Sequence, residues 1–112
     1  MIQSLFSLEG KVAVISGGSG AIGRGAAKIL ESLGARIVLT GHTKEHLLSA
    51  RESLPAHADV SVLLGDARDQ GHVNEILELG ESLGGVDILV NCIGTQRRRP
   101  LIDATAEDLE YL

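Results

Sequence analysis

The sequence predicts an α/β fold, namely a doubly wound parallel sheet with strand order 3-2-1-4 that ends at its fourth strand. Three observations predict this fold. Short aliphatic runs alternate with segments of helical periodicity, the runs are apolar at consecutive positions, and a glycine cluster follows the first run. Consecutive apolar positions are typical of strands buried on both faces, and right-handed crossovers between such strands give this order.

Four segments are expected to form the strands, because each is short and rich in β-branched or aliphatic residues. They are residues 12–15, 36–40, 60–64 and 86–90. No linker, repeat or low-complexity tract interrupts the pattern, so the chain is expected to form one domain over residues 1–112. Because the sheet stops at strand four, we expect that strand to expose apolar side chains and to promote association into homo-oligomers. The side chains concerned are Ile88, Leu89 and Val90.

Three helices are expected between the strands. The first runs from Ile22 to a C-terminal cap at Gly34, the second covers residues 44–54 before Pro55, and the third covers residues 70–83. The apolar stripe of the first helix is expected to comprise Ile22, Ala26, Ile29, Leu30 and Leu33. The inward side chains of the third helix are expected to be Val73, Ile76, Leu77 and Leu83. Residues 105–108 resemble a capping box, which predicts the start of a fourth helix.

Composition limits the classes of partner. The chain has 15 acidic and 10 basic residues, a net charge of −5, one Tyr, one Phe and no Trp. Nucleic-acid binding favours clustered cations and stacking aromatics, so nucleic acid is not expected as a partner. No apolar run reaches membrane-spanning length and no leader segment is expected, so we expect a cytoplasmic protein with no membrane partner. The single cysteine excludes an intramolecular disulfide, which fits a reducing compartment.

The glycine cluster lies between the first expected strand and the first expected helix. Gly18, Gly20 and Gly23 have the Gly-x-Gly-x-x-Gly spacing of a dinucleotide-binding loop. In that setting the free N–H groups and the dipole of the helix face a pyrophosphate, and missing Cβ atoms allow its close approach. A phosphate-binding P-loop is excluded because Arg24 and Gly25 follow the last glycine. A methyltransferase is disfavoured because the second strand ends without an acidic residue, whereas a glycine-rich turn without a ligand remains the less favoured alternative.

These motifs together resemble the short-chain dehydrogenase/reductase family over essentially the whole chain. Ser16-Gly17 and Gly23 match the family's Thr-Gly-x-x-x-Gly-x-Gly loop, with Ala21 in place of the middle glycine, while Gly20 fits a variant of that loop. Residues 87–94 read Asp-Ile-Leu-Val-Asn-Cys-Ile-Gly, which is similar to the family's Asp-x-Leu-Val-Asn-Asn-Ala-Gly segment. The resemblance implies the cofactor-binding half of a Rossmann-type oxidoreductase.

The resemblance also implies roles for individual residues. The loop residues expected to bind the cofactor are Gly17, Ser19, Gly20, Ile22 and Gly23. Asp66 and Ala67 are expected at the adenine, although Asp66 could instead cap the third helix, for which Asp69 is a competing cap. Asn91 is expected to support the sheet through amide bonds to neighbouring strands, with a turn-forming role as the alternative. Gly94 is expected to let the backbone pass close to the ribose of the cofactor.

The end of the second expected strand bears on the choice of cofactor. NAD-binding domains carry an acidic residue there, and none occurs between Ala35 and Lys44. The family's NADP-preferring members often have Thr-Gly-Arg at this point. Here His42 stands at the Arg position, and Lys44 could add charge. The resemblance therefore favours NADP over NAD.

Two further patterns concern substrate and metal. Arg97 and Arg98 belong to a Gln-Arg-Arg-Arg-Pro run that looks like the corresponding loop of gluconate- and sugar-acid-oxidising members, where an arginine could hold a carboxylate. A solvated loop is the alternative. His42 and His46 match the His-x-x-Glu-His pattern of a zinc-protease class. His42 falls at a strand end rather than on one helix face with His46, so no metal is expected.

The resemblance implies hydride transfer between a nicotinamide and an alcohol or ketone. The family's proton transfer uses a Ser and a Tyr-x-x-x-Lys pair. The chain has no such pair, because Tyr111 is followed by Leu112 alone. We therefore expect the catalytic residues beyond Leu112 and no activity in the 112 residues themselves. A nucleotide-binding module without catalysis is the alternative.

Overall fold

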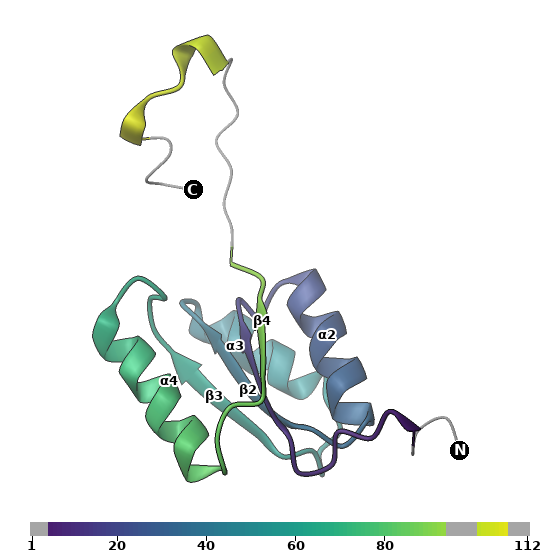
Figure 1. The fold of residues 1–112 in the computed structure, drawn as a ribbon. Helices are drawn as coiled ribbons and strands as arrows, with labels where there is room; N and C mark the ends of the chain where they lie inside the picture. The colour runs from purple at the N-terminus through teal and green to yellow at the C-terminus, as the bar shows by residue number, and fades with distance from the viewer. Residues whose placement is uncertain (1–4, 94–100, 108–112) are drawn as a thin grey trace.

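The computed structural model describes residues 5–93 and 101–107 of the chain. Strands and helices alternate in the order that the sequence predicts (Figure 1). The elements are β1 (Val12–Ser16), α2 (Ala21–Ser32), β2 (Arg36–Gly41), α3 (Lys44–Glu52), β3 (Val60–Leu64), α4 (Gln70–Ser82), β4 (Ile88–Asn91) and the 3-10 turn η1 (Leu101–Asp103). Residues 106 and 107 are helical, where a fourth helix was expected to start. No helix in these two ranges is long and apolar enough to cross a bilayer.

The four strands form one parallel sheet in the order β3-β2-β1-β4. Ser16 at the end of β1 lies opposite Thr40 of β2 on one side and opposite Asn91 of β4 on the other. Gly41 at the end of β2 lies opposite Leu64 of β3. The predicted doubly wound order is therefore confirmed, and all four strands end at the same edge of the sheet.

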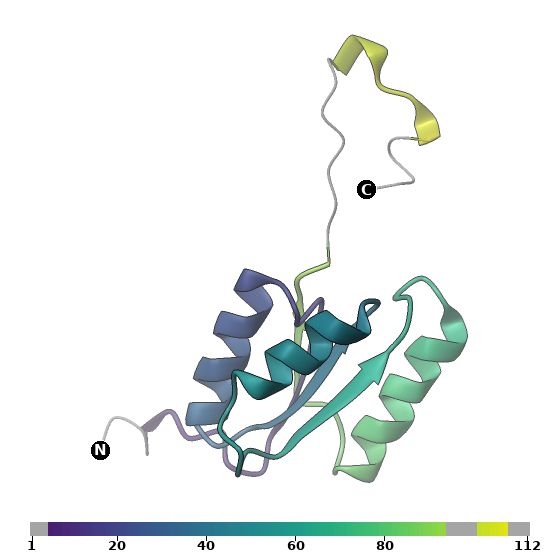
Figure 2. The same cartoon turned by 180° about the vertical axis from the view of Figure 1, so that it is seen from behind.

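Helices cover the two faces of the sheet unequally (Figures 1 and 2). α2 and α3 pack on one face, and α4 packs on the other. The first face is built on Ala13, Ile15, Ile37 and Leu39, against which Ala27, Leu47, Ala50 and Leu54 of the helices and the following turn pack. The second is built on Val12, Val14 and Val38, against which Ile76, Leu79 and Leu83 pack. β1 and β2 are thus buried on both faces, as their consecutive apolar residues predict.

β4 does not follow that prediction on both faces. Ile88 and Val90 pack against the core on the side of α2 and α3, whereas Leu89, which points the other way, is 68% exposed. The difference arises because the apolar side chains of α4 pack over β1 and β2, on Val12, Val14 and Val38, rather than over β4. The expected exposure of apolar surface at strand four is confirmed at Leu89, while Ile88 and Val90 are partly covered.

The predicted inward stripe of α2 is wrong at Ile22 and Ile29, whereas Leu30 packs against the core as expected. Ile22 and Ile29 are 79% and 64% exposed, while Gly23 and Ala27 are buried against the sheet. Small residues face inward because α2 approaches the backbone of the loop that precedes it, where a branched side chain has no room. Gly34 has a φ of 102°, which confirms the helix end expected there.

The inward face of α4 also differs from the expectation. Leu77 is 53% exposed, and Leu79 instead packs with Ile76 and Leu83 against the sheet. Both leucines fit an apolar helical stripe, and the position of the helix over the sheet decides between them. His72 and Gly80 of α4 are the buried positions at the two ends of this face.

Two element boundaries differ from the expectation by two residues. β4 begins at Ile88 rather than at residue 86, because the side chain of Asp87 takes over a strand contact. Its Oδ2 accepts a hydrogen bond from the N–H of Val12 at 3.0 Å, and its own N–H donates to the Val12 carbonyl at 3.0 Å. α3 ends at Glu52 rather than residue 54, where the Ser53 hydroxyl donates to the carbonyl of Ala50 at 2.6 Å.

Candidate functional site

The carboxyl ends of the strands bring four separate segments to one edge of the sheet (Figure 1). The segments are the loop between β1 and α2, the turn between β2 and α3, the turn between β3 and α4, and the residues that follow β4. In open parallel sheets this edge is where ligands bind. The residues that the sequence singles out lie in these four segments or next to them, in the first turn of α2 or α3 or at the end of β4. Gly94, Arg97 and Arg98 fall outside the described residues.

The glycine-rich loop folds tightly between β1 and α2. The N–H groups of Gly17 and Gly18 both donate to the carbonyl of Thr40, at 3.0 and 3.2 Å, and the N–H of Gly20 donates to the Gly17 carbonyl at 3.2 Å. Gly17 has a φ of 75°, which residues with a side chain rarely adopt. A Cβ at Gly17 would also lie 2.9 Å from the backbone carbonyl of Cys92. The loop is therefore closed against the residue that follows β4.

The N-terminus of α2 presents its N–H groups without a side-chain cap. Gly20 occupies the N-cap position, no side-chain cap bond is formed there in the described structure, and the first turn carries no acidic residue. A Cβ at Gly23 would lie 2.6 Å from the Gly17 carbonyl oxygen and 2.8 Å from the Gly18 Cα, so only glycine permits this close packing of helix on loop. Ile22 is exposed at the same end. Free N–H groups and the positive end of the helix dipole suit an anion such as a phosphate.

Arg24 braces this loop, a contact that the sequence did not reveal. Its Nε donates to the Ser19 carbonyl at 2.9 Å, and its Nη2 reaches the His46 carbonyl of α3 at 3.4 Å. The side chain therefore links the glycine-rich loop to the first turn of α3. No sequence pattern pointed to it, because the partners are backbone carbonyls and one of them lies 22 residues away along the chain.

The turn between β2 and α3 carries histidine and lysine but no carboxylate. His42 is exposed, and its Nδ1 lies 3.1 Å from the Thr43 hydroxyl. A Cβ at Gly41 would lie 3.7 Å from the Ser19 hydroxyl, so the Ser19 side chain lies beside the end of β2. His42 precedes α3 whereas His46 lies within it. The residues that the structure describes hold no group of three or more side chains that could bind a metal ion.

The two aspartates of the turn between β3 and α4, Asp66 and Asp69, have different partners. Asp69 is the N-cap of α4, with its Oδ1 accepting from the Gly71 N–H at 3.2 Å. Asp66 does not cap this helix. Its carboxylate accepts from the Arg68 N–H at 2.9 Å and pairs with the Arg68 guanidinium, with 2.9 Å between Oδ2 and Nη2. Of the two caps that the sequence allowed, Asp69 is the one the structure selects.

The Arg68 guanidinium and backbone N–H lower the pKa of Asp66 from 3.8 to about 2. We predict that the Asp66 carboxyl, followed by NMR in a pH titration, has a midpoint near that value, and that Arg68→Ala moves it back toward 3.8. Because the folded pKa is lowered, the pair stabilises the fold above pH 3.8, and this contribution disappears as the pH falls toward 2. Both side chains are exposed, so we expect a small effect on stability. An unchanged midpoint in Arg68→Ala would contradict the assignment.

The end of β4 shows a turn-forming asparagine rather than a sheet-bridging one. Asn91 Oδ1 accepts from the Ile93 N–H at 3.2 Å, and this local bond is the one that its side chain makes within the described ranges. The expected amide bonds to neighbouring strands are therefore absent there, because a side chain at the very end of an edge strand lies nearer its own following residues. The Cys92 N–H donates to the Ser16 carbonyl at 2.8 Å, and its thiol is free.

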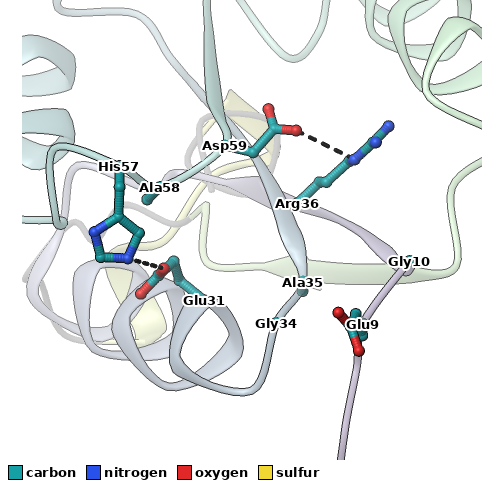
Figure 3. A pocket seen from close by; sticks show the side chains of 9 residues that line it. All are labelled: Glu9, Gly10, Glu31, Gly34, Ala35, Arg36, His57, Ala58 and Asp59. Carbon is teal, nitrogen blue, oxygen red and sulfur yellow. Dashed lines mark ion pairs between the residues drawn. The ribbon is translucent and has the colours of Figure 1, made fainter.

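A cavity of about 410 Å³ lies at the opposite edge of the sheet, where β2 and β3 begin (Figure 3). Its charged lining includes an Arg36–Asp59 ion pair at 3.2 Å, and Glu31 lies 4.0 Å from His57. The cavity shares no residue with the four segments at the carboxyl edge. This cavity and the glycine-rich loop are therefore at different ends of the strands, and the N–H groups of α2 favour the loop as the anion site.

Comparison with known proteins gives consistent matches. The family model for short chain dehydrogenases matches residues 11–112. The chain is 37% identical over 110 residues to gluconate 5-dehydrogenase of Gluconobacter oxydans, an alignment that covers 96% of the chain and 43% of that enzyme. A dehydrogenase/reductase structure from Sinorhizobium meliloti matches with a TM-score of 0.84 at 34% identity, covering 97% of the chain and 44% of that protein.

A second similar structure was solved with ligands bound. L-sorbose reductase from Gluconobacter frateurii, solved in complex with NADPH and L-sorbose, matches with a TM-score of 0.80 at 35% identity. The match covers 95% of the chain and 41% of the reductase. The chain thus spans less than half the length of the relatives that it matches.

Proposed function

The chain belongs to the short-chain dehydrogenase family, and on that premise we propose that it binds a nicotinamide dinucleotide at the carboxyl edge of its sheet. The observation that carries this proposal is the uncapped N-terminus of α2, packed through Gly23 onto the backbone of a loop in which Gly17 has no room for a side chain. That arrangement leaves N–H groups and a helix dipole available for a pyrophosphate. The proposed unit is a single nucleotide-binding domain over residues 1–112.

We propose that each of the other segments holds a different part of the cofactor. Ser19, Gly20 and Ile22 would lie at the pyrophosphate with Gly17 and Gly23, Asp66 and Ala67 at the adenine, and Gly94 at the ribose. An ionised carboxylate offers about four acceptor positions, and Asp66 uses three of them on Arg68. One position is thus left to accept from an amino group. Asn91 would support the glycine-rich loop indirectly, by shaping the turn after β4 against which that loop packs.

NADP is the proposed cofactor rather than NAD. His42 and Lys44 follow β2, and no acidic residue between Ala35 and Lys44 is available to accept from a ribose 2′-hydroxyl or to repel a 2′-phosphate. A relative of similar fold was solved with NADPH, which supports the same choice. Once bound, the nicotinamide would supply the hydride chemistry of the family.

For the whole protein we propose oxidation of an alcohol or reduction of a ketone, with a sugar acid as the substrate class. Support comes from the likeness to gluconate 5-dehydrogenase and from Arg97 and Arg98, whose guanidinium groups suit a carboxylate. The 112 residues by themselves are predicted to give no turnover with NADP and any alcohol or ketone, because they contain no Tyr-x-x-x-Lys pair. Measurable turnover above the uncatalysed rate in a spectrophotometric assay would contradict this. The expected cytoplasmic location stays a prediction.

We further propose that copies of the chain associate through β4. Leu89 is 68% exposed on this edge strand, which pairs with β1 alone among the described strands. Leu89→Lys is predicted to shift sedimentation-velocity profiles from oligomer toward monomer, because a lysine on the strand opposes the burial of that face. Leu77→Lys, a matched change at an exposed leucine of α4, is the control and is expected to leave the profile unchanged. A monomeric unsubstituted chain would refute the proposal.

Isothermal titration of the chain with NADP⁺ tests the proposed cofactor directly. We expect saturable binding to one site, and competition by ADP-ribose. Binding of ADP-ribose and NADP⁺ without any turnover would support the cofactor-binding role, whereas the absence of binding by both ligands would overturn it.

A further inference from the structure

His72 is a buried histidine whose Nδ1 has no hydrogen-bond partner in the described part of the chain. The residue is 5% exposed and lies in the first turn of α4. A buried polar atom that makes no hydrogen bond is unfavourable, so such atoms are rare in folded proteins. Because no hydrogen bond through Nδ1 holds the ring there, packing contacts must fix its position.

The imidazole ring lies directly against Gly65. A Cβ built on Gly65 would fall 2.6 Å from Cε1 of His72 and still closer to Cγ and Nδ1, so the ring occupies the space that any side chain at position 65 would need. Contacts of this length do not occur between real Cβ atoms and their neighbours. Gly65 and His72 are therefore complementary, with the absence of one side chain making room for the other.

Gly65 connects this contact to the carboxyl edge of the sheet. It is the first residue after β3, and its N–H donates to the carbonyl of Gly41, the last residue of β2, at 2.9 Å. His42 follows Gly41, and Asp66 and Ala67 follow Gly65. The turn is closed by the Asp69 N–H, which donates to the Asp66 carbonyl at 2.9 Å. The ring thus packs on the residue that links the two turns proposed to hold the adenosine half of the cofactor.

We propose that His72 is a positioning residue for adenine binding: its ring, packed on Gly65, fixes the turn of residues 65–69 so that Asp66 and Ala67 face the nucleotide. The inference rests on the proposed dinucleotide site, and the role assigned to His72 is to position the turn rather than to bind the ligand, because the residue is 5% exposed and its Nδ1 is buried. It acts through packing rather than polarity. A close-packed ring restricts the neighbouring backbone, and its loss would leave a void beside the turn.

Two ligands separate this role from a general effect on folding. 5′-AMP reports on the adenine turn, and inorganic pyrophosphate reports on the glycine-rich loop, with dissociation constants measured by NMR titration at a temperature where each variant is folded. Gly65→Ala is expected to raise the dissociation constant of 5′-AMP at least tenfold. The dissociation constant of pyrophosphate is expected to stay within twofold of that of the unsubstituted chain. Gly71→Ala is the matched control in the same region, because its Cβ would meet nothing closer than 3.6 Å.

Variants of His72 test the ring itself. His72→Ala is expected to weaken the binding of 5′-AMP several-fold. His72→Phe is expected to retain the affinity for 5′-AMP, because it keeps a flat ring and removes the unpaired nitrogen. The double variant Gly65→Ala/His72→Ala is expected to bind 5′-AMP more tightly than Gly65→Ala alone, since the alanine methyl group enters the space that the ring leaves.

The possible results have distinct consequences. Equal losses for 5′-AMP and pyrophosphate, an unchanged affinity in His72→Ala, or no difference between Gly65→Ala and Gly71→Ala would overturn the inference while leaving the proposed function intact. Failure of the unsubstituted chain to bind either ligand would overturn both. If Gly65→Ala does not fold, the comparison of His72→Ala with His72→Phe decides the matter.

Discussion

Gly23→Ala is expected to remove dinucleotide binding and to destabilise the fold. The added Cβ would lie 2.6 Å from the Gly17 carbonyl oxygen and 2.8 Å from the Gly18 Cα. Both are backbone atoms, which cannot rotate away as the end of a side chain can. Relief requires α2 to move away from the loop, which costs on the order of 1–3 kcal/mol and displaces the N–H groups that face the pyrophosphate.

Gly25→Ala provides a control on the same helix. A Cβ at Gly25 meets nothing within 4 Å, so this change is expected to stabilise α2 by roughly 0.5–1 kcal/mol without affecting binding. Thermal unfolding and titration with NADP⁺ measure the two effects. We expect Gly23→Ala to lower the unfolding temperature and Gly25→Ala to raise it. Similar changes in stability and in NADP⁺ binding for the two variants would show that the close packing of α2 on the loop is unimportant.

Gly17→Ala should reach the same loss of binding by a different route. Its φ of 75° is strained for alanine, and its Cβ would lie 2.9 Å from the Cys92 carbonyl group. The loop, rather than the helix, would therefore change shape. Normal NADP⁺ affinity in a folded Gly17→Ala variant would contradict this account of the loop.

His42→Asp is expected to shift the cofactor preference from NADP toward NAD. The change leaves the glycine-rich loop intact and places a carboxylate at the end of β2, where it would repel a 2′-phosphate and accept from a 2′-hydroxyl. Because His42 is exposed, we expect the ratio of the two affinities to change by roughly tenfold, about 1.4 kcal/mol. Titrations with NADP⁺ and NAD⁺ measure this ratio.

His57→Asp is the matched control for charge. It makes the same substitution at the cavity on the opposite edge of the sheet, with a side chain that is 85% exposed. We expect its ratio of affinities to equal that of the unsubstituted chain. An equal shift in both variants would mean that net charge rather than position sets the preference, and no shift in His42→Asp would remove the assignment of His42 without affecting the glycine-rich loop.

The strand order and the sites of the helices were predictable because they depend on local patterns. Continuous apolar runs identify β1 and β2 as central strands, and crossover handedness then fixes the neighbours. Burial was less predictable, since it depends on what covers a residue. Leu89 is as apolar as Val14, the buried residue beside it in the sheet, yet it is exposed because the apolar side chains of α4 pack over β1 and β2 instead. Ile22 and Ile29 likewise fit an inward stripe that close helix packing gives to Gly23 and Ala27.

The candidate site was predictable where glycines and strand ends mark it, and unpredictable where distant backbone contacts build it. The spacing of the glycines located the loop, yet nothing in the sequence indicated that Arg24 would bond to carbonyls of Ser19 and His46. The contact of His72 with Gly65 is similar, because it depends on how the first turn of α4 folds back over the end of β3. Such contacts follow from tertiary packing rather than from local periodicity.

We propose that the glycine-rich loop and the ends of β2 and β3 form one dinucleotide site. The most direct measurement is the change in backbone amide chemical shifts of the ¹⁵N-labelled chain on addition of NADP⁺. We predict saturable changes at Gly17, Gly20, Gly23, His42 and Ala67, with the same dissociation constant for each. Changes confined to Gly10, Gly34 and Ala58, which line the cavity on the opposite edge, or no saturable change at the loop, would contradict the claim.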